Sequence, residues 1–296
     1  MRLSENSWRF WRSFAGGGEN VPAALTAEVL GVPLWVLLVL ALVAAAAGWI
    51  DAVSGGGGML QLPALLVLLP GVPVAQALGT NKLSSIIGTS AAATTYARRF
   101  RPDPATAVPM VIGAIIGAGI GAYAASGIPQ QVFRPIVLLM LIGIWVWTLV
   151  KPGMGARDEE RWSAPKYRRH RLVVSSLGGL GIGLYDGAFG PGTGSFLLIL
   201  LVAGLGLSFL HASATAKLVN LSTNAAALAV FASTGSVLWA VGLVMGLCNL
   251  SGAVLGARTA IARGSGFVRV VFLVIVGLLI CRLAWEVLVA FWGLPQ

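Results

Sequence analysis

Charged residues are scarce in this chain: they make up 10% of its 296 residues, whereas 57% of the residues are hydrophobic. A soluble domain carries about 25% charged residues, because its surface has to face water. The composition therefore excludes a soluble globular protein. Apolar runs of about 20 residues, the length that crosses a bilayer core, indicate a polytopic membrane protein instead. The clearest of these runs are 32–50, 105–125, 132–150, 237–257 and 267–290.

Cysteine and histidine are nearly absent, with two residues of each. Cys248 and Cys281 lie in apolar segments, so their positions predict neither a disulfide framework nor a metal site. His170 and His211 stand apart from any serine and carboxylate arrangement that would indicate nucleophilic catalysis. No Gly-Lys-Ser/Thr phosphate-binding motif occurs, which argues against ATP as an energy source. We therefore expect no enzyme activity, no metal ion and no cofactor.

A cleavable signal peptide is also missing, because Arg9 and Arg12 interrupt the short apolar run near the N-terminus. Residues 4–14 instead mix aromatic side chains with arginines. This pattern fits a helix that lies at the membrane interface. It fits a disordered tail equally well, and both interpretations stay open.

Acidic residues are outnumbered by basic ones, 10 against 20, which gives a formal net charge of +10. Such an excess can indicate nucleic-acid binding. Here, however, the basic residues gather in the loops 98–101, 151–171 and 258–263, which is the pattern of cytoplasmic connections between membrane spans. The sequence therefore predicts a multi-pass protein of the cell (inner) membrane. We expect the lipid bilayer as its partner and no binding of nucleic acid.

An internal repeat with a shift of 135 residues and no gaps is the most informative feature present. Charges in apolar segments are costly, so a duplicated set of them indicates function. Arg134 and Arg269 lie near an interface, where we expect them to anchor the chain by snorkelling. The shift superposes identical residues in both repeats: Asp51 and Asp186, Lys82 and Lys217, Arg134 and Arg269, Gly55 and Gly190, Gly57 and Gly192, Thr80 and Thr215.

Each repeat contains five apolar elements, which we expect to be helical because the backbone in lipid must satisfy its own hydrogen bonds. The predicted fold is thus all-α, with an N-terminal segment (1–30), a first repeat (31–150), a basic cytoplasmic linker (151–171) and a second repeat (172–296). The predicted elements are 32–53, 58–70, 73–97, 105–125 and 132–150 in the first repeat and 172–188, 193–206, 208–233, 237–258 and 266–290 in the second.

Loop charge predicts how the repeats are oriented. The basic loop 98–104 corresponds to the neutral loop 233–236, and the neutral loop 126–131 corresponds to the basic loop 258–266. If basic loops are cytoplasmic, the two repeats have opposite orientations in the membrane. Five crossings per repeat would produce this arrangement. The second element of each repeat is short, however, at ~18 Å of helix. Four crossings per repeat, with parallel repeats, therefore stay open as an alternative.

A glycine-rich break precedes each short element: the first break is Gly55–Gly58 and the second is Gly190–Gly194. Such segments at matching positions of two halves are the best sequence indication of a transporter's substrate site. Glycine leaves the backbone N–H groups accessible, and the start of the following helix attracts anions. The alternative is that these glycines only allow close helix packing. We predict that the two breaks meet near the membrane midplane and bind an anion.

A second set of glycines recurs at every fourth position, which is the spacing of one helix face. Gly113, Gly117 and Gly121 form this stripe in the first repeat, and Gly252 and Gly256 repeat it in the second. Small residues at this spacing let two helices approach closely in membranes. We therefore expect the stripe to be a helix-packing surface.

The buried charges allow two interpretations. Lys82 and Lys217 can balance the charge of an anionic substrate, or they can form permanent ion pairs with Asp51 and Asp186, either within a repeat or between repeats. The aspartates can cap the breaks or carry protons for coupling. The predicted substrate-binding residues are Gly55, Gly56, Gly57, Gly58, Thr80, Asn81, Lys82, Gly190, Gly192, Thr193, Gly194, Ser195, Thr215, Lys217 and Asn220.

Three stretches carry a family resemblance. They are residues 183–194, Gly-Leu-Tyr-Asp-Gly-Ala-Phe-Gly-Pro-Gly-Thr-Gly, together with 51–59, Asp-Ala-Val-Ser-Gly-Gly-Gly-Gly-Met, and 77–81, Ala-Leu-Gly-Thr-Asn. From about residue 34 to 290 the chain resembles the TauE/SafE family of membrane permeases, the sulfite-exporter type. The resemblance implies secondary transport, mainly export, of small sulfur-containing anions such as sulfite, thiosulfate, sulfoacetate or other organosulfonates. A passive anion channel is the alternative function.

Overall fold

The computed structural model describes residues 28–29, 32–69, 72–125, 142, 146, 149–150 and 168–292. Nearly all of these residues are helical, as the all-α prediction requires. The exception is a short antiparallel pair of strands, β1 (Glu28–Val29) and β2 (Val32–Pro33), at the start of the first long helix. The predicted N-terminal segment 4–14 and most of the basic linker lie outside the described residues.

Four helices of the first repeat match the predicted elements within two residues at either end. They are α3 (Leu34–Ser54), α4 (Gly58–Leu68), α5 (Val74–Ala97) and α6 (Pro104–Ala124). The predicted fifth element, 132–150, is described only at residues 142, 146, 149 and 150, which are helical. Arg134 lies outside the described residues.

The second repeat begins with α8 (Arg168–Ala188), which starts four residues earlier than predicted, inside the expected linker. The short helix α9 (Thr193–Ile199) continues as a turn of π-helix, η3 (Leu200–Gly204). Helix α10 (Phe209–Ser233) follows, and α11 (Trp239–Trp292) completes the described chain. The two short elements, α4 and α9, therefore occupy matching positions in the two repeats.

The predicted loop 258–266 is shorter than expected. The helix continues as far as Arg263, and a break at Gly264, where φ is 79° and ψ is 179°, separates it from the helix that follows. A positive φ of this size is rarely adopted by residues with side chains, so glycine marks the break. The preceding residues, Arg-Thr-Ala-Ile-Ala-Arg, include good helix formers and contain no helix breaker, and polarity alone does not stop a helix.

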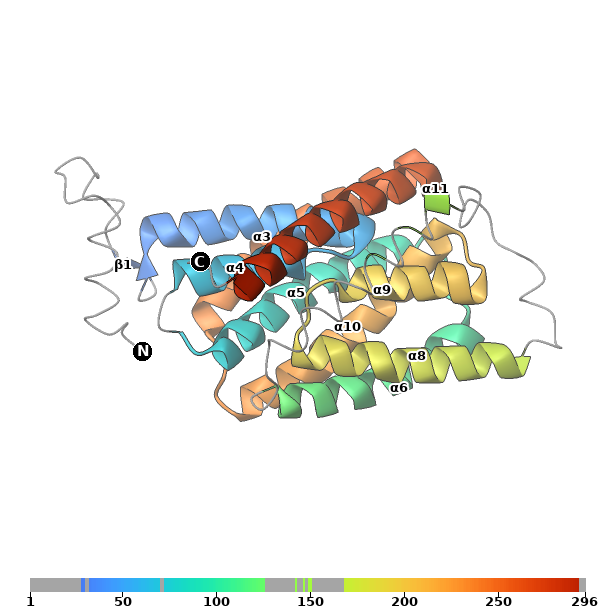
Figure 1. Ribbon diagram of the computed structural model, residues 1–296, viewed down its shortest axis with the longest axis horizontal. Coiled ribbons are helices and arrows are strands. Elements are labelled where there is room, and N and C mark those ends of the chain that lie inside the picture. The colour runs from blue at the N-terminus through green and yellow to red at the C-terminus, as the bar shows by residue number, and fades with distance from the viewer. Residues whose placement is uncertain are drawn as a thin grey trace.

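The long helices pair between the two repeats. Figure 1 shows α3 alongside α11 at one edge of the bundle and α6 alongside α8 at the other. Under the 135-residue shift, α8 corresponds to α3 and the first half of α11 corresponds to α6, so the two pairs are equivalent. Helices α5 and α10 contact each other, and each also packs against the fourth helix of the other repeat. The repeats are thus interleaved.

The glycine stripe lies at these paired interfaces, as predicted. A side chain at Gly117 of α6 would overlap the backbone carbonyl of Leu180 in α8. A side chain at Gly252 of α11 would overlap the carbonyl of Ala45 in α3, and Ala45 is the repeat equivalent of Leu180. Helix backbones in direct contact leave no room for a methyl group. The close-packing interpretation of the stripe is confirmed.

Large apolar side chains cover the outside of α3, α6, α8 and α11. The exposed residues include Leu42, Ile112, Ile116, Leu177, Leu247 and Leu255. Among the described helices, three are long and apolar enough to cross a membrane: Leu34–Ser54, Pro104–Ala124 and Trp239–Val274. An apolar exterior of this extent is costly in water and favourable in lipid. Within the fully described helices α5 and α10, by contrast, Val74 is the one exposed large hydrophobic residue.

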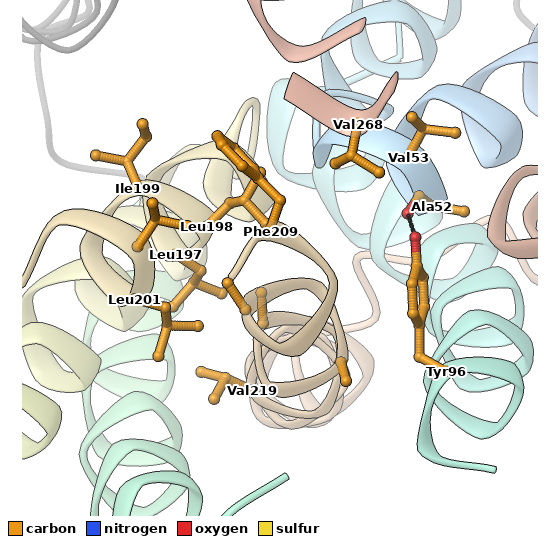
Figure 2. Packing of buried hydrophobic residues seen from close by; sticks show 14 of the residues in the cluster. Ala52, Val53, Tyr96, Leu197, Leu198, Ile199, Leu201, Phe209, Val219 and Val268 are labelled. Carbon is orange, nitrogen blue, oxygen red and sulfur yellow. Dashed lines mark hydrogen bonds between the residues drawn. The ribbon is translucent and has the colours of Figure 1, made fainter. Parts of the chain in front are cut away.

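A buried apolar cluster surrounds α9 and the start of α10 and includes Leu197, Leu201 and Phe209. Figure 2 shows these side chains on one side and Tyr96 of α5 on the other, where its hydroxyl donates a hydrogen bond of 2.9 Å to the carbonyl of Ala52. Carbonyls in the last turn of a helix have no intrahelical partner. Tyr96 therefore satisfies one such carbonyl at the end of α3.

Candidate functional site

The two glycine breaks lie against each other. Gly55 ends α3 with φ of 84°, and Gly190 follows α8 with φ of 82°. Gly55 and Gly194 are in backbone contact, so that a side chain on either one would overlap the backbone of the other. Glycine is required both for these φ values and for this approach. The structure thus brings together two segments that are far apart in the sequence.

Helices α4 and α9 begin directly at the breaks. Gly57 precedes α4, Gly192 precedes α9, and neither helix start has a side-chain cap. Within the described part of the chain, the N–H groups of Gly58 and Gly194 donate no hydrogen bond. Both helix starts therefore present amide donors toward the place where the breaks meet.

A small polar cavity, part of which is open to solvent, lies at this meeting point. Both repeats contribute to its wall, and every lining residue other than glycine carries a polar or charged side chain. The lining residues are Asp51, Gly55, Gly58, Asn81, Lys82, Ser85, Thr89, Asp186, Gly190, Thr193, Gly194, Asn220 and Asn224.

Two ion pairs cross between the repeats. Lys82 Nζ of α5 lies 2.7 Å from Asp186 Oδ2 of α8, and Lys217 Nζ of α10 lies 2.8 Å from Asp51 Oδ2 of α3. Lys217 also donates a hydrogen bond to the backbone carbonyl of Asp51. Of the ion-pair arrangements that the sequence left open, the structure contains the one between repeats. Pairing matters here because a buried charge without a partner is strongly destabilising.

The two pairs differ in their surroundings. The side chains of Lys82 and Asp186 are 1% and 2% exposed, whereas Asp51 is 17% exposed. Asp186 also accepts a hydrogen bond of 2.5 Å from the hydroxyl of Thr193. The residue equivalent to Thr193 in the first repeat is Gly58, which has no hydroxyl. The site is therefore symmetric in its charges and asymmetric in its hydrogen bonds.

Amides and hydroxyls complete the wall. Asn81 is 2% exposed, and its Oδ1 has no hydrogen-bond partner. Asn224 donates a hydrogen bond of 3.2 Å to the side chain of Asn220, one turn earlier in α10. An amide oxygen that is buried without a partner costs free energy unless a ligand or water satisfies it. The lining thus has unused hydrogen-bonding capacity.

The predicted substrate-binding residues do not include Ser85, Thr89 and Asn224. Asn224 lies one helical turn after the predicted Asn220, and the 135-residue shift makes Ser85 equivalent to Asn220 and Thr89 equivalent to Asn224. Both positions follow Asn81 at intervals of four residues, which places them on one face of α5. Comparing lining residues with the equivalent positions of the other repeat therefore identifies site residues that composition alone does not.

Several predicted site residues do not line the cavity. Thr80 donates to the carbonyl of Gln76 and accepts from the N–H of Leu238, so it joins α5 to the start of α11. Thr215 donates to the carbonyl of His211 in its own helix. The other predicted residues outside the lining are Gly56, Gly57, Gly192, Ser195 and Lys217.

Among those residues, Ser195 and Lys217 still contact the end of α3. The Ser195 hydroxyl donates a hydrogen bond of 2.8 Å to the carbonyl of Ser54. Lys217 reaches the cavity through its bonds to Asp51. Both residues come from the second repeat and bind the last turn of a helix in the first repeat. They hold the first break in place.

Comparison with known proteins agrees with this architecture. The model of the family described as "Sulfite exporter TauE/SafE" matches residues 40–283. The chain is 39% identical over 229 residues to a "Probable membrane transporter protein ORF9" from Sinorhizobium sp, which covers 77% of this chain and 85% of that protein.

Two further relatives are each 32% identical to the chain. One is a "Probable membrane transporter protein" from Haemophilus influenzae, over 87% of this chain and 97% of the relative, and the other is "Probable membrane transporter protein YfcA" from Escherichia coli K12, over 84% and 89%. No solved structure matches the chain. The family match covers both glycine breaks and both ion pairs, and the chain therefore belongs to the sulfite exporter TauE/SafE family of membrane transporters.

Proposed function

We propose that this chain is a secondary transporter that exports small sulfur-containing anions, such as sulfite, thiosulfate, sulfoacetate or another organosulfonate, by alternating access. The observation that carries the proposal is the polar cavity that both repeats build where the two glycine breaks meet. The description of the matching family names sulfite export, which motivates the substrate class and the direction.

The α5 side of the cavity offers donors to an anion. Lys82 lines the cavity beside its partner Asp186, and Asn81, Ser85 and Thr89 add side-chain groups from α5. An oxyanion offers several acceptor atoms to such donors, and hydrogen bonds to a charged acceptor are about twice as strong as neutral ones. Because the surroundings are buried, each of these interactions is less screened than it would be in water.

The direction of the helices supports an inverted repeat. Gly79 near the start of α5 contacts Phe231 near the end of α10, and Tyr96 near the end of α5 lies beside Ser213 near the start of α10. The equivalent helices α5 and α10 therefore run antiparallel. Inverted repeats around a central site are the common basis of alternating access, in which one unit rocks against the other.

Loop charge supports the same orientation. Helix α5 is followed by the basic loop 98–101, whereas the equivalent helix α10 is followed by the neutral loop 234–236. If α5 and α10 are antiparallel, these two loops lie on opposite sides of the membrane. Basic loops are retained in the cytoplasm, so the ends of α5 and α10 obey this rule in an inverted arrangement.

A flux assay tests the proposal. Purified protein in liposomes is expected to give saturable sulfite or thiosulfate flux and counterflow, in which unlabelled anion on one side drives uptake of labelled anion from the other. Uptake that rises linearly with concentration and shows no counterflow would indicate the passive channel instead. Saturable flux of carboxylates with none of sulfur anions would contradict the substrate class.

A further inference from the structure

We infer that the anion binds at the first glycine break, at the start of α4, and that Asn81 of α5 is the side chain that decides how tightly it binds. The inference rests on the proposed function, because it locates the anion within the cavity of that site. Both breaks line the cavity, and the 135-residue shift makes them equivalent in sequence. Their free hydrogen-bonding groups differ, however, and this difference favours the first break.

The first break offers three consecutive backbone donors. In the part of the chain that the structure describes, the N–H groups of Gly56, Gly57 and Gly58 donate no hydrogen bond. The nearby Asp51 carboxylate accepts from Lys217 and leaves these amides free. Helix α4 is 11 residues long, with no side-chain cap and no acidic residue in its first turn. Successive free N–H groups at the start of a helix attract anions, and the helix dipole adds to this effect.

The second break offers fewer donors. Pro191 has no N–H group, and the N–H of Thr193 donates to the Gly190 carbonyl. The Thr193 hydroxyl also donates within its own repeat. The N–H groups that remain, those of Gly192 and Gly194, are not consecutive. The second break therefore uses much of its hydrogen-bonding capacity on itself.

A buried side chain without a partner stands at the first break. Asn81 lines the cavity, is 2% exposed, and its Oδ1 has no hydrogen-bond partner. A Cβ at Gly58 would lie 3.7 Å from Asn81 Nδ2, so the amide lies beside the start of α4. A buried amide of this kind needs a ligand or water to satisfy it. The equivalent residue in the second repeat is Ala216, which has no polar side chain.

The same difference between the repeats recurs around Asn81. Among the described residues, Gln61 Oε1 of α4 and Ser84 Oγ of α5 are also buried without a partner. Their equivalents in the second repeat are Phe196 and Val219, which belong to the buried apolar cluster around α9. Buried polar groups without partners cost stability. The first repeat keeps them where the second repeat has an apolar core, which indicates a role that the second repeat does not share.

An oxyanion at the start of α4 would meet donors from several elements. A Cβ at Gly58 would lie 3.7 Å from the Gly190 carbonyl, and a Cβ at Gly190 would lie 3.2 Å from Lys82 Nζ, so the lysine is close to this place. The Lys82 ammonium group has three N–H donors, and its ion pair with Asp186 leaves others available. The helix start and Lys82 then balance the charge of the anion, and the Asn81 amide holds one of its oxygens.

Anion binding to the full-length protein in detergent tests the inference, with labelled sulfite and thiosulfate as probes. Asn81→Ala gives α5 the side chain that α10 has at the equivalent position. It is expected to weaken binding of both anions at least about tenfold, because a hydrogen bond to a charged acceptor is lost. Thermal unfolding without anion is expected to occur at the wild-type temperature or above it, because Asn81 Oδ1 has no partner to lose. Asn81→Leu, which fills the space without a donor, is expected to act in the same way and takes its place if Asn81→Ala does not fold.

Asn220→Ala is the matched variant, because it removes an amide that lines the same cavity from the second repeat. It is expected to weaken binding less than Asn81→Ala does. Wild-type affinity in Asn81→Ala, or an equal or larger loss in Asn220→Ala, would overturn the inference and leave the proposed function intact. Weaker binding together with a lower unfolding temperature without anion would assign Asn81 a structural role and would also overturn it. Absence of sulfite and thiosulfate binding in the wild-type protein would instead contradict the proposed function itself.

Discussion

The ends of α3 and α8 are equivalent in sequence, yet the structure holds them in different ways. The last turn of α3 is bound from outside: Ser195 donates to the Ser54 carbonyl, and Lys217 donates to the Asp51 carbonyl. The end of α8 is closed by its own neighbours, because Thr193 donates both to Asp186 and to the Gly190 carbonyl.

This difference shows how a duplicated unit can separate two roles. The first break depends on side chains of the second repeat, so a movement between the repeats would change its hydrogen bonds. The second break is bonded within its own repeat through Thr193, although its Asp186 is also paired with Lys82 of the first repeat. Identical charges therefore need not have identical tasks. Four sets of variants test whether the two breaks differ in this way.

The largest effect is expected from loss of the fixed lysine. Lys82→Met leaves the fully buried Asp186 without its ion-pair partner and is expected to destabilise the protein by about 3–5 kcal/mol. Lys217→Met is the matched variant and is expected to cost less, because the Asp51 side chain is 17% exposed and stays partly solvated. Unfolding of both variants in detergent measures the difference. Equal losses of stability would show that the two pairs are equivalent.

A second pair of variants removes the hydroxyl beside Asp186 and places one beside Asp51. Thr193→Val removes a bond to a charged group, which is expected to cost about 1.5–3 kcal/mol. Gly58→Thr places the same hydroxyl beside Asp51, and a Cβ at Gly58 would lie 3.6 Å from Pro191 Cα, which is ordinary contact. We expect Gly58→Thr to stabilise the protein, because the added hydroxyl can donate a hydrogen bond to the Asp51 carboxylate.

Unfolding in detergent measures the effects of Thr193→Val and Gly58→Thr. Gly58→Ala is the control, since it adds a Cβ at the same position without a hydroxyl. If Gly58→Ala changes the stability as much as Gly58→Thr does, the effect comes from bulk at the helix start and the comparison of the two hydroxyl positions fails.

The helix interfaces provide a test in which the repeats should agree. Gly117→Ala and Gly252→Ala each force a methyl group into a backbone of the other repeat and are expected to cost about 1–3 kcal/mol each. Gly119→Ala, also in α6, is the control, because a Cβ at Gly119 would have no atom within 4 Å. Thermal unfolding of the three proteins measures the effect. A neutral result for one interface glycine only would show that the interfaces are not equivalent.

The smallest effect is expected at a position where one repeat has a hydroxyl and the other lacks it. Tyr96 is equivalent to Phe231, so Tyr96→Phe makes the first repeat resemble the second. The change removes the hydrogen bond to the Ala52 carbonyl and is expected to cost about 0.5–1.5 kcal/mol. Unfolding in detergent measures it, with Phe231→Tyr as the reverse variant. A loss as large as that of Lys82→Met would mean that Tyr96 does more than satisfy one carbonyl.

Much of the fold follows from local sequence signals. Apolar runs, the breaks at Gly55 and Gly190 and the basic loops locate α3 to α6 and α8 to α10 within a few residues, because each signal acts on its own segment. The same logic made the loop at residues 258–266 too long, because its arginines suggested a break over the whole stretch. Polarity at a membrane surface is compatible with a helix that continues, and only Gly264 provides a backbone reason for a break.

The candidate site was harder to predict. Thr80 and Thr215 carry hydroxyls beside the lysines, and both use them for helix bonds instead of lining the cavity. A hydroxyl in a helix can bond to the preceding turn or face outward, and the choice depends on the neighbouring helix. The lining residue Thr89 was missed as well, although its spacing from Asn81 places it on the face of α5 that lines the cavity.

The sequence by itself determined that the chain is a duplicated, helical membrane protein with two glycine breaks and a matched set of buried charges. Periodicity, composition and the 135-residue shift are local or pairwise properties of the chain and can be read directly. Only the tertiary structure decided that Lys82 pairs with Asp186 and Lys217 with Asp51, and that one pair is sealed while the other faces a cavity. These outcomes depend on how helices from different repeats interleave, and that arrangement minimises the cost of all the buried groups together.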